Sequence, residues 1–412
     1  MSQHPATTLG AMTSGSLASS GTTATRRGLR IAMVGQKGVP ATIGGVEHHV
    51  EQIGSRLAAR GHDVLVYSRS SYSELPAGSR YLGMQVLSAP TIGTKHLDAI
   101  VHSGASAVKA IAAGADVVHF HALGPGLAAP LPRYLSGAKV VLTVHGLDNT
   151  RDKWGRLART VLDAAHWMSG HVPDRTVVVS RELQEHYRTR FGTQAAYITN
   201  GVAAFDRVAS TDVVERLGLV PGGYTMFVGR LVPEKRPDLL IRAFRATDLD
   251  QQLAIVGSSS FTESFTAHLR DLAGNDPRIV FTGFVGGTDL HAVFQSSALV
   301  VQPSDVEGLP LTLLEAVAHG CPVLASDIGP HREVVGTATS GLHRIFPQGD
   351  QAALQAALVE PVVGDGWSDP ARQRVLDHYS WDRAAVQLEE LYLDVVGTGR
   401  RHRKPPHGQY AP

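Results

Sequence analysis

The sequence predicts an α/β protein with two parallel sheets that face each other across a cleft. Short apolar segments alternate with helical patterns along the chain, which is typical of parallel sheets covered by helices. The series of strands begins at Leu29 and begins again within 221–230, after a less regular stretch. A chain of 412 residues is long enough for two such domains. Residues 29–205 and 221–380 are therefore predicted to form the first and the second domain.

The first domain begins with LRIAMVG (29–35), an apolar run ending in glycine that predicts a buried parallel strand. The next segment predicts a helix that ends near Gly61, because apolar residues recur there at helical spacing. These residues are Val46, Val50, Ile53 and Leu57. Further strands are predicted at 63–68, 116–121, 139–145 and 175–180.

The second domain repeats this alternation and is followed by one more helix. Its strands are predicted within 221–230, 253–257, 278–283, 298–304 and 321–326. Residues 381–396 predict a helix with one face formed by Trp381, Ala385, Leu388, Leu391 and Tyr392. The terminal stretches 1–28 and 397–412 are polar and are predicted to be disordered tails. The first of them lacks the continuous apolar segment of a signal peptide.

The composition excludes several classes of protein. Lys and Arg number 38 against 37 Asp and Glu, so nothing in the charge indicates a nucleic-acid partner. A single cysteine, Cys321, gives neither a disulfide framework nor a thiolate metal site, which fits the reducing cytoplasm. No apolar run approaches the ~18–20 residues of a membrane span. Any contact with a membrane is therefore expected to be peripheral.

A glycine-rich turn follows the first predicted strand, in GQKGVPATIGGVEHH (35–49). Gly44 and Gly45 open the helix, where glycine lets backbone N–H groups approach a phosphate at the positive end of the helix dipole. A dehydrogenase fingerprint has a different spacing and an acidic residue after the second strand, where this chain has Ser68 and Arg69. A nicotinamide cofactor is therefore disfavoured. The alternative is that these glycines serve only tight turns.

Three histidines lie at strand ends. His119 and His121 flank Phe120, and alternation puts both on the same side of their strand, while His145 ends the next strand. Two histidines can bind zinc, but no Asp, Glu or Cys lies nearby at the usual ligand spacing. No metal is therefore expected. The alternative to a functional role is that these histidines are ordinary hydrogen-bonded residues at strand ends.

Two cations follow the first strand of the second domain, in GRLVPEKRPDLL (229–240). Arg230 ends the strand and Lys235 lies in the turn before a helix. This pair suits a diphosphate, which Arg binds through its planar fork and Lys as a point charge. A solvated basic turn is the alternative.

The segment PSDVEGLPLTLLEAVAHGCPVLAS (303–326) contains two glutamates eight positions apart. Glu307 lies in a predicted loop that enters the cleft. Glu315 lies in the second turn of a helix predicted to begin at Pro310, with Leu311, Leu314 and Ala318 facing the sheet. The amides before this helix are free to point into the cleft. One carboxylate can accept hydrogen bonds from a sugar and the other from a ribose diol.

Together these motifs resemble the retaining, nucleotide-sugar-dependent glycosyltransferases of family 4, which have the GT-B fold of two Rossmann-like domains. The resemblance covers roughly residues 29–396. It is carried by the Gly44-Gly45 turn, DVVHFH, ITNGV, GRLVPEK and the spacing of the two glutamates. The segments GQKGVPATIGGVEHHVE and VGSSSFTESFTAHLRDL are similar to exopolysaccharide and capsule glycosyltransferases.

The resemblance implies a role for each matching residue in the second domain. Arg230 and Lys235 would bind the donor diphosphate and stabilise it as it leaves. Glu307 would hydrogen-bond the transferred sugar together with the amides of Gly308 and Leu309.

It also implies roles elsewhere in the cleft. Glu315 would hold the ribose hydroxyls, and Gly44 and Gly45 would let their loop close on the diphosphate. His121 matches the family's histidine near the anomeric centre. The helix at 381–396 would cross back to the first domain.

The chain departs from the family in two places. Glu-Gly-Phe-Gly is frequent where this chain has Glu307-Gly308-Leu309-Pro310, so one backbone donor is lost. The loop at 258–260 is Ser-Ser-Ser in place of an Asp-Gly-Pro type, which leaves base and sugar open. No Asp-x-Asp motif for a diphosphate-bound metal is present, in agreement with the family's metal-independent chemistry.

The implied function is retaining, metal-independent transfer of a sugar from a nucleoside-diphosphate sugar, with no cofactor, to an acceptor hydroxyl. The expected acceptor is a lipid-linked or polysaccharide glycan intermediate. Two alternatives stay open: a sugar-nucleotide epimerase on the same fold and a non-catalytic partner subunit. The presence of Arg230, Lys235, Glu307 and Glu315 favours the transferase.

The segment 149–168 raises the question of membrane contact. Trp154, Leu157, Ala158, Val161, Leu162 and Ala165 fall on one face of a predicted helix, and Lys153, Arg156 and Arg159 fall mostly on another. One interpretation is a surface helix packed on the sheet. The other is an interfacial helix on anionic lipid at the inner face of the plasma membrane, supported by the basic tail Arg400, Arg401, Arg403 and Lys404.

Overall fold

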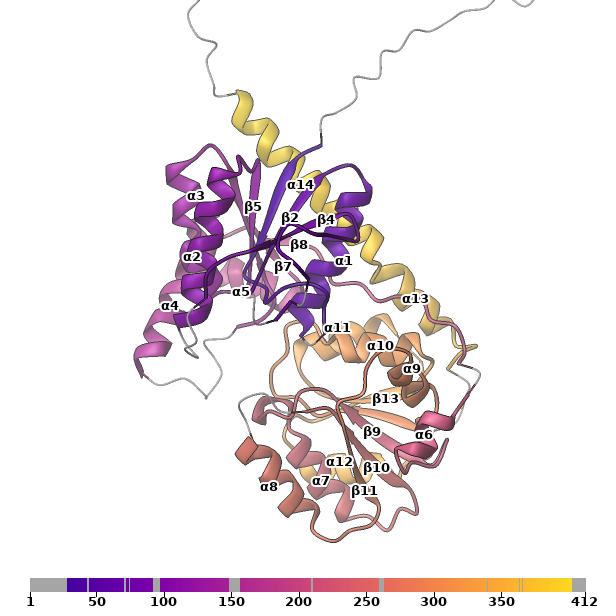
Figure 1. Cartoon of the computed structure of the whole chain (residues 1–412). Helices are drawn as coiled ribbons and strands as arrows, with labels where there is room; N and C mark the ends of the chain where they lie inside the picture. The colour runs from indigo at the N-terminus through magenta and orange to yellow at the C-terminus, as the bar shows by residue number, and fades with distance from the viewer. Residues whose placement is uncertain are drawn as a thin grey trace, which may run out of the picture.

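The computed structural model shows two α/β domains, one above the other in Figure 1, each built on one sheet. It describes residues 28–401 except 43, 70–71, 74, 92–96, 148–155, 209, 259–262, 339, 363 and 365. The predicted fold class is confirmed. The predicted tail at 1–28 lies, except for Gly28, outside the described residues, and so does the basic tail from residue 402.

The first sheet has eight strands in the order β3-β4-β2-β1-β5-β6-β7-β8, and every pair is parallel except β3 with β4. The strands are β1 Arg30–Val34, β2 Asp63–Ser68, β3 Arg80–Tyr81, β4 Met84–Ser88, β5 Val117–His121, β6 Lys139–Val144, β7 Arg175–Val178 and β8 Ala196–Tyr197. Three of these, β3, β4 and β8, were not predicted. β3 and β8 are the edge strands and β4 pairs with β3. All three are short or only half-buried, and they lack a continuous apolar run.

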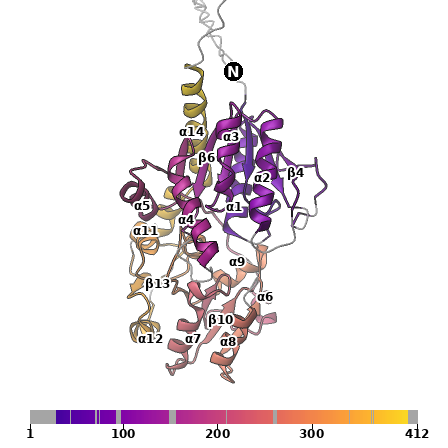
Figure 2. The same ribbon diagram turned by 90° about the vertical axis from the view of Figure 1, so that its left-hand side faces the viewer.

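Helices cover both faces of this sheet, as Figures 1 and 2 show. One face carries α1 Gly45–Ala59 and α14 Trp381–Arg401. The other carries α2 Leu97–Ala112, η1 Pro125–Ala128, α3 Pro130–Leu135, α4 Arg156–His171 and α5 Arg181–Phe191. Strand alternation divides the core between the two faces: Ile31 and Met33 face α1, and Ala32 and Val34 face the opposite layer.

The last helix, α14, returns from the second domain and packs along α1. Where the chain crosses, a Cβ on Gly201 would lie 2.2 Å from the amide nitrogen of Trp381, so only glycine fits. Arg60 of α1 pairs with Glu389 of α14 at 2.5 Å. The helix continues to Arg401, beyond the predicted end at residue 396.

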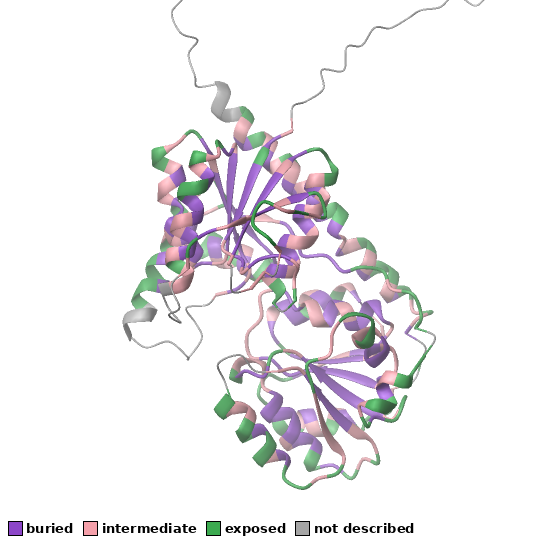
Figure 3. Ribbon diagram, in the orientation of Figure 1, coloured by how far each residue is buried: buried purple, intermediate pink, exposed green. Residues whose placement is uncertain are grey.

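The second sheet has six parallel strands in the order β11-β10-β9-β12-β13-β14. They are β9 Tyr224–Val228, β10 Gln252–Val256, β11 Ile279–Gly283, β12 Leu299–Gln302, β13 Val323–Ser326 and β14 His343–Phe346. One face is covered by α7 Pro237–Arg245, α8 Glu263–Ala273 and α12 Gln351–Val359. The other is covered by α6 Asp212–Arg216, α9 Gly287–Gln295, α10 Leu311–Ala318, α11 Gly329–Thr337 and α13 Pro370–His378. Figure 3 shows both sheets buried between their helices.

The two domains touch at the loops that follow the carboxyl ends of their strands, the place where open α/β sheets bind ligands. The backbone of Gly146, after β6, lies beside that of Gly308, after β12. Beyond this point Glu333 of α11 accepts hydrogen bonds from the backbone N–H of Arg181 at 2.8 Å and from the hydroxyl of Tyr197 at 2.5 Å. These contacts hold the two strand-end loops against each other.

Candidate active site between the two sheets

Glu307 lies on the loop between β12 and α10 and forms an ion pair with Lys235, with Nζ 2.5 Å from Oε1. Both side chains are largely buried, at 9% and 17% exposure. Burial pushes the pKa of Glu307 up, but the charges of Lys235 and His331 and the hydrogen bond from Lys235 outweigh it, so the pKa is lowered. Glu307 is therefore a carboxylate at neutral pH.

Glu315, on the second turn of α10, has a different environment. Its side chain is half-buried and makes no ion pair or hydrogen bond with any other described residue. Burial raises its pKa to about 7. Proton uptake and release at Glu315 are therefore expected close to neutral pH.

Helix α10 begins at Leu311, with Pro310 in the preceding cap position at φ −77° and ψ 91°. The predicted start at Pro310 is thus one residue early. Leu311 also reaches the first domain, where a Cβ on Gly45 would lie 3.4 Å from its side chain. It is half-buried at the interface and packs against the core clusters on both sides.

The two predicted cations have different surroundings. Lys235 ends the short helix η3 Pro233–Lys235 and contacts Glu307. Arg230 follows β9 and is exposed, and its side chain makes no hydrogen bond or ion pair within the described part of the chain. Arg230 is therefore available to an anion, whereas Lys235 is shared with a carboxylate.

Sequence reasoning missed Arg236, which adjoins Lys235. Its backbone is left-handed, with φ 52°, and its guanidinium pairs with Asp305 at 2.9 Å and Asp238 at 3.3 Å. Asp305 lies two residues before Glu307, so this pair anchors the loop that carries the catalytic candidate. The signal was present as a third cation in GRLVPEKR.

The predicted glycines lie where the two domains meet. Gly44 has φ +118°, a conformation that favours glycine, and Gly45 is the first residue of α1. No side chain caps this end of α1. A Cβ on Gly308 would lie 1.7 Å from the carbonyl oxygen of His145, so only glycine allows this approach. Leu309 is buried beside it.

The predicted histidines take two separate roles. His119 is fully buried, with Nδ1 2.6 Å from the hydroxyl of Tyr392 and Nε2 2.7 Å from that of Thr143. It joins α14 to the sheet, and its ring centroid lies 4.1 Å from that of His121. His121 and His145 instead approach each other, with Nδ1 and Nε2 3.3 Å apart.

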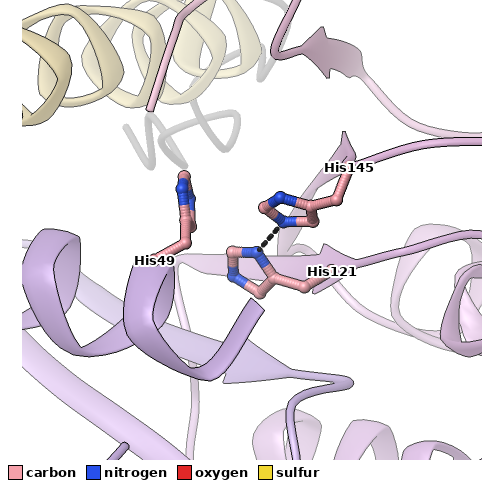
Figure 4. Close-up of side chains that lie close together, drawn as sticks. All are labelled: His49, His121 and His145. Atoms are coloured by element: carbon pink, nitrogen blue, oxygen red, sulfur yellow. Dashed lines mark hydrogen bonds between the residues drawn. The ribbon is translucent and has the colours of Figure 1, made fainter. Parts of the chain in front are cut away.

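His49, on α1, completes a group that the sequence did not predict (Figure 4). Its ring centroid lies 4.7 Å from that of His145 and 5.4 Å from that of His121. Burial, followed by the neighbouring imidazoles, lowers the pKa of His121 and His145 well below the usual range, and burial lowers that of His49 to about 4. The three rings are therefore neutral at pH 7. The sequence did contain a signal for His49: it lies four residues before the buried Ile53, so helical spacing puts both on the same face of α1.

Two surface depressions lie elsewhere and lack this chemistry. One is lined by Arg30, Asp63 and Asp116 at the amino ends of the first sheet's strands. The other lies between the residues after α7 and helix α12. Ligands of open α/β folds bind at the carboxyl ends, so the interdomain region remains the candidate site.

Both domains match known families of glycosyltransferases. Residues 43–204 match the family described as Glycosyltransferase Family 4, and residues 221–362 match Glycosyl transferases group 1. The chain is a family 4 glycosyltransferase. Of the alternatives that the sequence left open, the transferase is the one that these matches support.

Curated relatives align with the transferase over nearly their whole length. A protein named glycogen synthase from Mycobacterium tuberculosis is 29% identical, with 92% of this chain and 97% of the relative covered. A GDP-mannose-dependent alpha-(1-6)-phosphatidylinositol monomannoside mannosyltransferase from Mycolicibacterium smegmatis is 29% identical, over 89% of this chain and 97% of the relative.

Solved structures share the GT-B fold. Sucrose-phosphate synthase from Thermosynechococcus elongatus superposes with a TM-score of 0.74 at 22% identity, covering 90% of the transferase and 100% of that chain. HepE from Anabaena, solved with UDP-glucose, gives a TM-score of 0.65 at 17% identity, over 90% and 98% of the two chains. The predicted GT-B fold is confirmed.

Proposed function

We propose that this glycosyltransferase moves a sugar from a nucleoside-diphosphate sugar to an acceptor hydroxyl, with retention of anomeric configuration and without a metal ion. The observation that carries the proposal is the buried Lys235–Glu307 pair, held against the first domain by Gly308. It joins a cation for the diphosphate and a carboxylate for sugar hydroxyls at one point of the interface.

The positive charge for the diphosphate comes from three sources. Arg230 is exposed and has no partner within the described ranges, so its planar fork is available to phosphate oxygens. Lys235 can bridge Glu307 and the diphosphate. The uncapped N-terminus of α1, at Gly44 and Gly45, adds the positive end of a helix dipole from the other domain. These groups take the place of a bound cation.

The proposed reaction occurs on one face of the sugar. The bond between the anomeric carbon and the leaving diphosphate oxygen breaks as the acceptor oxygen forms a bond on the same side. The proton of the acceptor hydroxyl passes to the leaving phosphate. The protein contributes positioning and stabilisation of the growing charge on the diphosphate. Glu307 is a hydrogen-bond acceptor in this scheme because Lys235 already neutralises it.

Glu315 is assigned to the ribose hydroxyls and His121 to the region of the anomeric carbon. The half-buried Glu315 lacks a partner among the described side chains, so a ribose diol would satisfy a carboxylate that burial now disfavours. His121 presents a neutral imidazole beside the loop after β6. A neutral ring can polarise a sugar hydroxyl without repelling Lys235 and Arg230.

The proposed acceptor is a glycan intermediate, either lipid-linked or a polysaccharide, in exopolysaccharide biosynthesis. The names of the relatives include one enzyme of polysaccharide synthesis and one that modifies a phosphatidylinositol mannoside, which supports this class of acceptor. Their names also make GDP-mannose a first donor to test, beside the UDP-glucose of the HepE structure.

We further propose peripheral contact with an anionic membrane at the cytoplasmic side, made by the layer of α3 and α4. Tyr134 and Leu135 of α3 are 69% and 70% exposed, and Trp167 of α4 is 55% exposed. Aromatic and aliphatic side chains of this kind suit a membrane interface. No helix in the described ranges is both long and apolar enough to cross a membrane. Residues 149–155 of the predicted interfacial helix lie outside the described residues. On its predicted apolar face Val161 is 37% exposed, whereas Leu162 and Ala165 are buried, so this part of the helix packs on the first domain.

The test is a screen of nucleotide sugars for binding, followed by product analysis with lipid-linked and polysaccharide acceptors. The proposal predicts that one donor binds and is consumed only when an acceptor is present. Conversion of the donor sugar into its epimer without an acceptor would contradict it.

A further inference from the structure

The three rings of His49, His121 and His145 converge from three separate elements: α1, the end of β5 and the loop after β6. Figure 4 shows His121 and His145 side by side, with His49 facing them from its helix. One nitrogen of each ring lies within 4.8 Å of the corresponding nitrogens of the other two. The family assignment gives a role only to His121, so the group as a whole has no assigned function.

The hydrogen bonds around these rings fix which nitrogens face the common space. Nδ1 of His49 donates to Oδ1 of Asn200 at 2.7 Å, which leaves a lone pair on Nε2. That Nε2 is buried and has no hydrogen-bond partner among the described residues. His121 has Nε2 3.5 Å from the sulfur of Met33, a weak acceptor, so its lone pair falls on Nδ1.

An imidazole held through its outer nitrogen, with the inner nitrogen free, is the arrangement of metal-binding histidines. A buried acceptor without a partner is destabilising, and a bound cation would satisfy it. Nδ1 of His121 also faces Nε2 of His145 at 3.3 Å. When His145 carries its proton on Nδ1, both facing nitrogens have lone pairs that one metal ion can bridge.

We propose that Nε2 of His49, Nδ1 of His121 and Nε2 of His145 bind a divalent transition metal of the Zn²⁺ type. Zinc–nitrogen bonds of about 2.0–2.1 Å place the ligand atoms of a tetrahedral site about 3.4 Å apart. The His121–His145 pair already has this spacing at 3.3 Å. A movement of His49 by roughly 1 Å closes the third side. Three neutral imidazoles leave the fourth position to water or a substrate hydroxyl.

The site has a consequence for activity that rests on the proposed function. A metal bound to Nδ1 of His121 withdraws this ring from the donor sugar and places a cation where the acceptor approaches. Zn²⁺ is therefore expected to inhibit transfer reversibly, and a chelator to restore it. Metal binding is measured separately from transfer, so a failure of the proposed metal site leaves the proposed transfer reaction untouched, and the reverse also holds.

The experiment titrates tag-free, full-length protein with Zn²⁺ against a chromophoric chelator and with Co²⁺ followed by visible absorption. We expect one Zn²⁺ per chain and a Co²⁺ spectrum of low coordination number. His145→Gln, which changes a half-buried ligand, is expected to abolish stoichiometric binding. Asn200→Ala keeps all three rings and is expected to weaken binding by about 10–100-fold, the usual effect of losing an outer hydrogen bond to a ligand.

Two control variants separate this site from adventitious binding to the chain's 20 histidines. His48→Gln changes the neighbouring residue of α1, and His186→Gln removes another close pair, in which Nε2 of His186 lies 3.1 Å from Nε2 of His166. Both variants are expected to keep the stoichiometric site. Equal Zn²⁺ affinity in His145→Gln, Asn200→Ala and His48→Gln would overturn the proposal, as would loss of the site in His186→Gln. Thermal unfolding of each variant checks the fold, and Asn200→Ala decides if His145→Gln does not fold.

Discussion

The two sides of the interdomain site handle polar groups in opposite ways. The first domain contributes neutral imidazoles, buried at the ends of β5 and β6 and on α1, whose charge is suppressed by burial. The second domain contributes formal charges: Lys235 paired with Glu307, an exposed Arg230, and a Glu315 that titrates near neutrality. In the proposed reaction the second domain therefore supplies the charged side chains for the donor, in addition to the N-terminus of α1. The imidazoles of the first domain would offer hydrogen bonds and lone pairs to the sugar and the acceptor.

The largest expected effect comes from removing charge on the second side. Arg230→Ala is expected to raise the activation free energy by about 3 kcal/mol, which lowers kcat/KM on the order of 10²-fold. The reason is that negative charge grows on the diphosphate as the bond breaks. Glu307→Gln is expected to lower kcat by ~10²-fold or more. Steady-state kinetics with the identified donor measures both effects. Arg245→Ala is the control, since Arg245 at the end of α7 donates a hydrogen bond to the carbonyl oxygen of Leu272 in α8. Unchanged kinetics in Arg230→Ala would place charge stabilisation elsewhere.

The contact between the two sides is tested at Gly308. A Cβ there would meet the carbonyl of His145, so Gly308→Ala must move the loop that carries Glu307. We expect a loss of kcat of about tenfold or more and a destabilisation of about 1–3 kcal/mol, the cost typical of overpacking. Gly104→Ala is the matched control, because a Cβ at Gly104 in α2 meets nothing within 4 Å. A fully active Gly308→Ala variant would show that the domains do not need this approach.

A smaller effect concerns the pH dependence of Glu315. Its pKa of about 7 in the folded protein lies above the usual 4.5, so the folded state holds the proton more tightly than the unfolded state. The resulting stabilisation is complete below about pH 4.5 and is lost as the pH rises through 7, by at most about 3 kcal/mol. Chemical unfolding at pH 5 and pH 8 is expected to show this fall in the wild type and not in Glu315→Gln.

The same carboxyl predicts how nucleotide binding depends on pH. The ionised form accepts hydrogen bonds from the ribose diol, so affinity for the nucleoside diphosphate is expected to fall below pH 7, by up to about tenfold per unit. Glu315→Gln is expected to bind more weakly at pH 8 and without this slope. An identical slope in both proteins would remove Glu315 from the ribose site.

The smallest expected effect lies outside the site, on the layer of α3 and α4. Trp167→Ala is expected to reduce co-sedimentation with anionic vesicles a few-fold at low salt, because one interfacial ring is lost. Phe284→Ala removes an aromatic residue of similar exposure, 56%, from the second domain and serves as the control. If the wild type fails to co-sediment with the vesicles at both low and physiological salt, the exposed residues do not bind the membrane.

Regular features of the sequence predicted most of the fold, and local patterns explain why. Buried parallel strands such as β1 and β10 contain continuous apolar runs, so their positions follow from local composition. The edge strands β3 and β8, their neighbour β4 and the last strand, β14, lack such runs and were missed. The pairing of His49 with Asn200, residues 151 positions apart, depends on tertiary folding and has no local signal.

The candidate site followed the same rule. Arg230, Lys235, Glu307 and Glu315 stand at strand ends and helix starts, which the local pattern locates. That Lys235 would contact Glu307, 72 positions away, could not be predicted from either motif. His119 and His121 have neighbouring rings, with centroids 4.1 Å apart, but different hydrogen-bond partners. This difference also required the structure, because Tyr392 of α14 binds the first of them.

The central claim is that the protein itself, without a metal ion, supplies the positive charge for the diphosphate. If Arg230, Lys235 and the end of α1 supply all the charge that the diphosphate needs, transfer proceeds in excess chelator. NMR of the product from such a reaction reports the configuration of the new linkage. The account predicts an active reaction and the same anomeric configuration as the donor. An inverted linkage, or activity that returns only when a divalent metal is added, would contradict it.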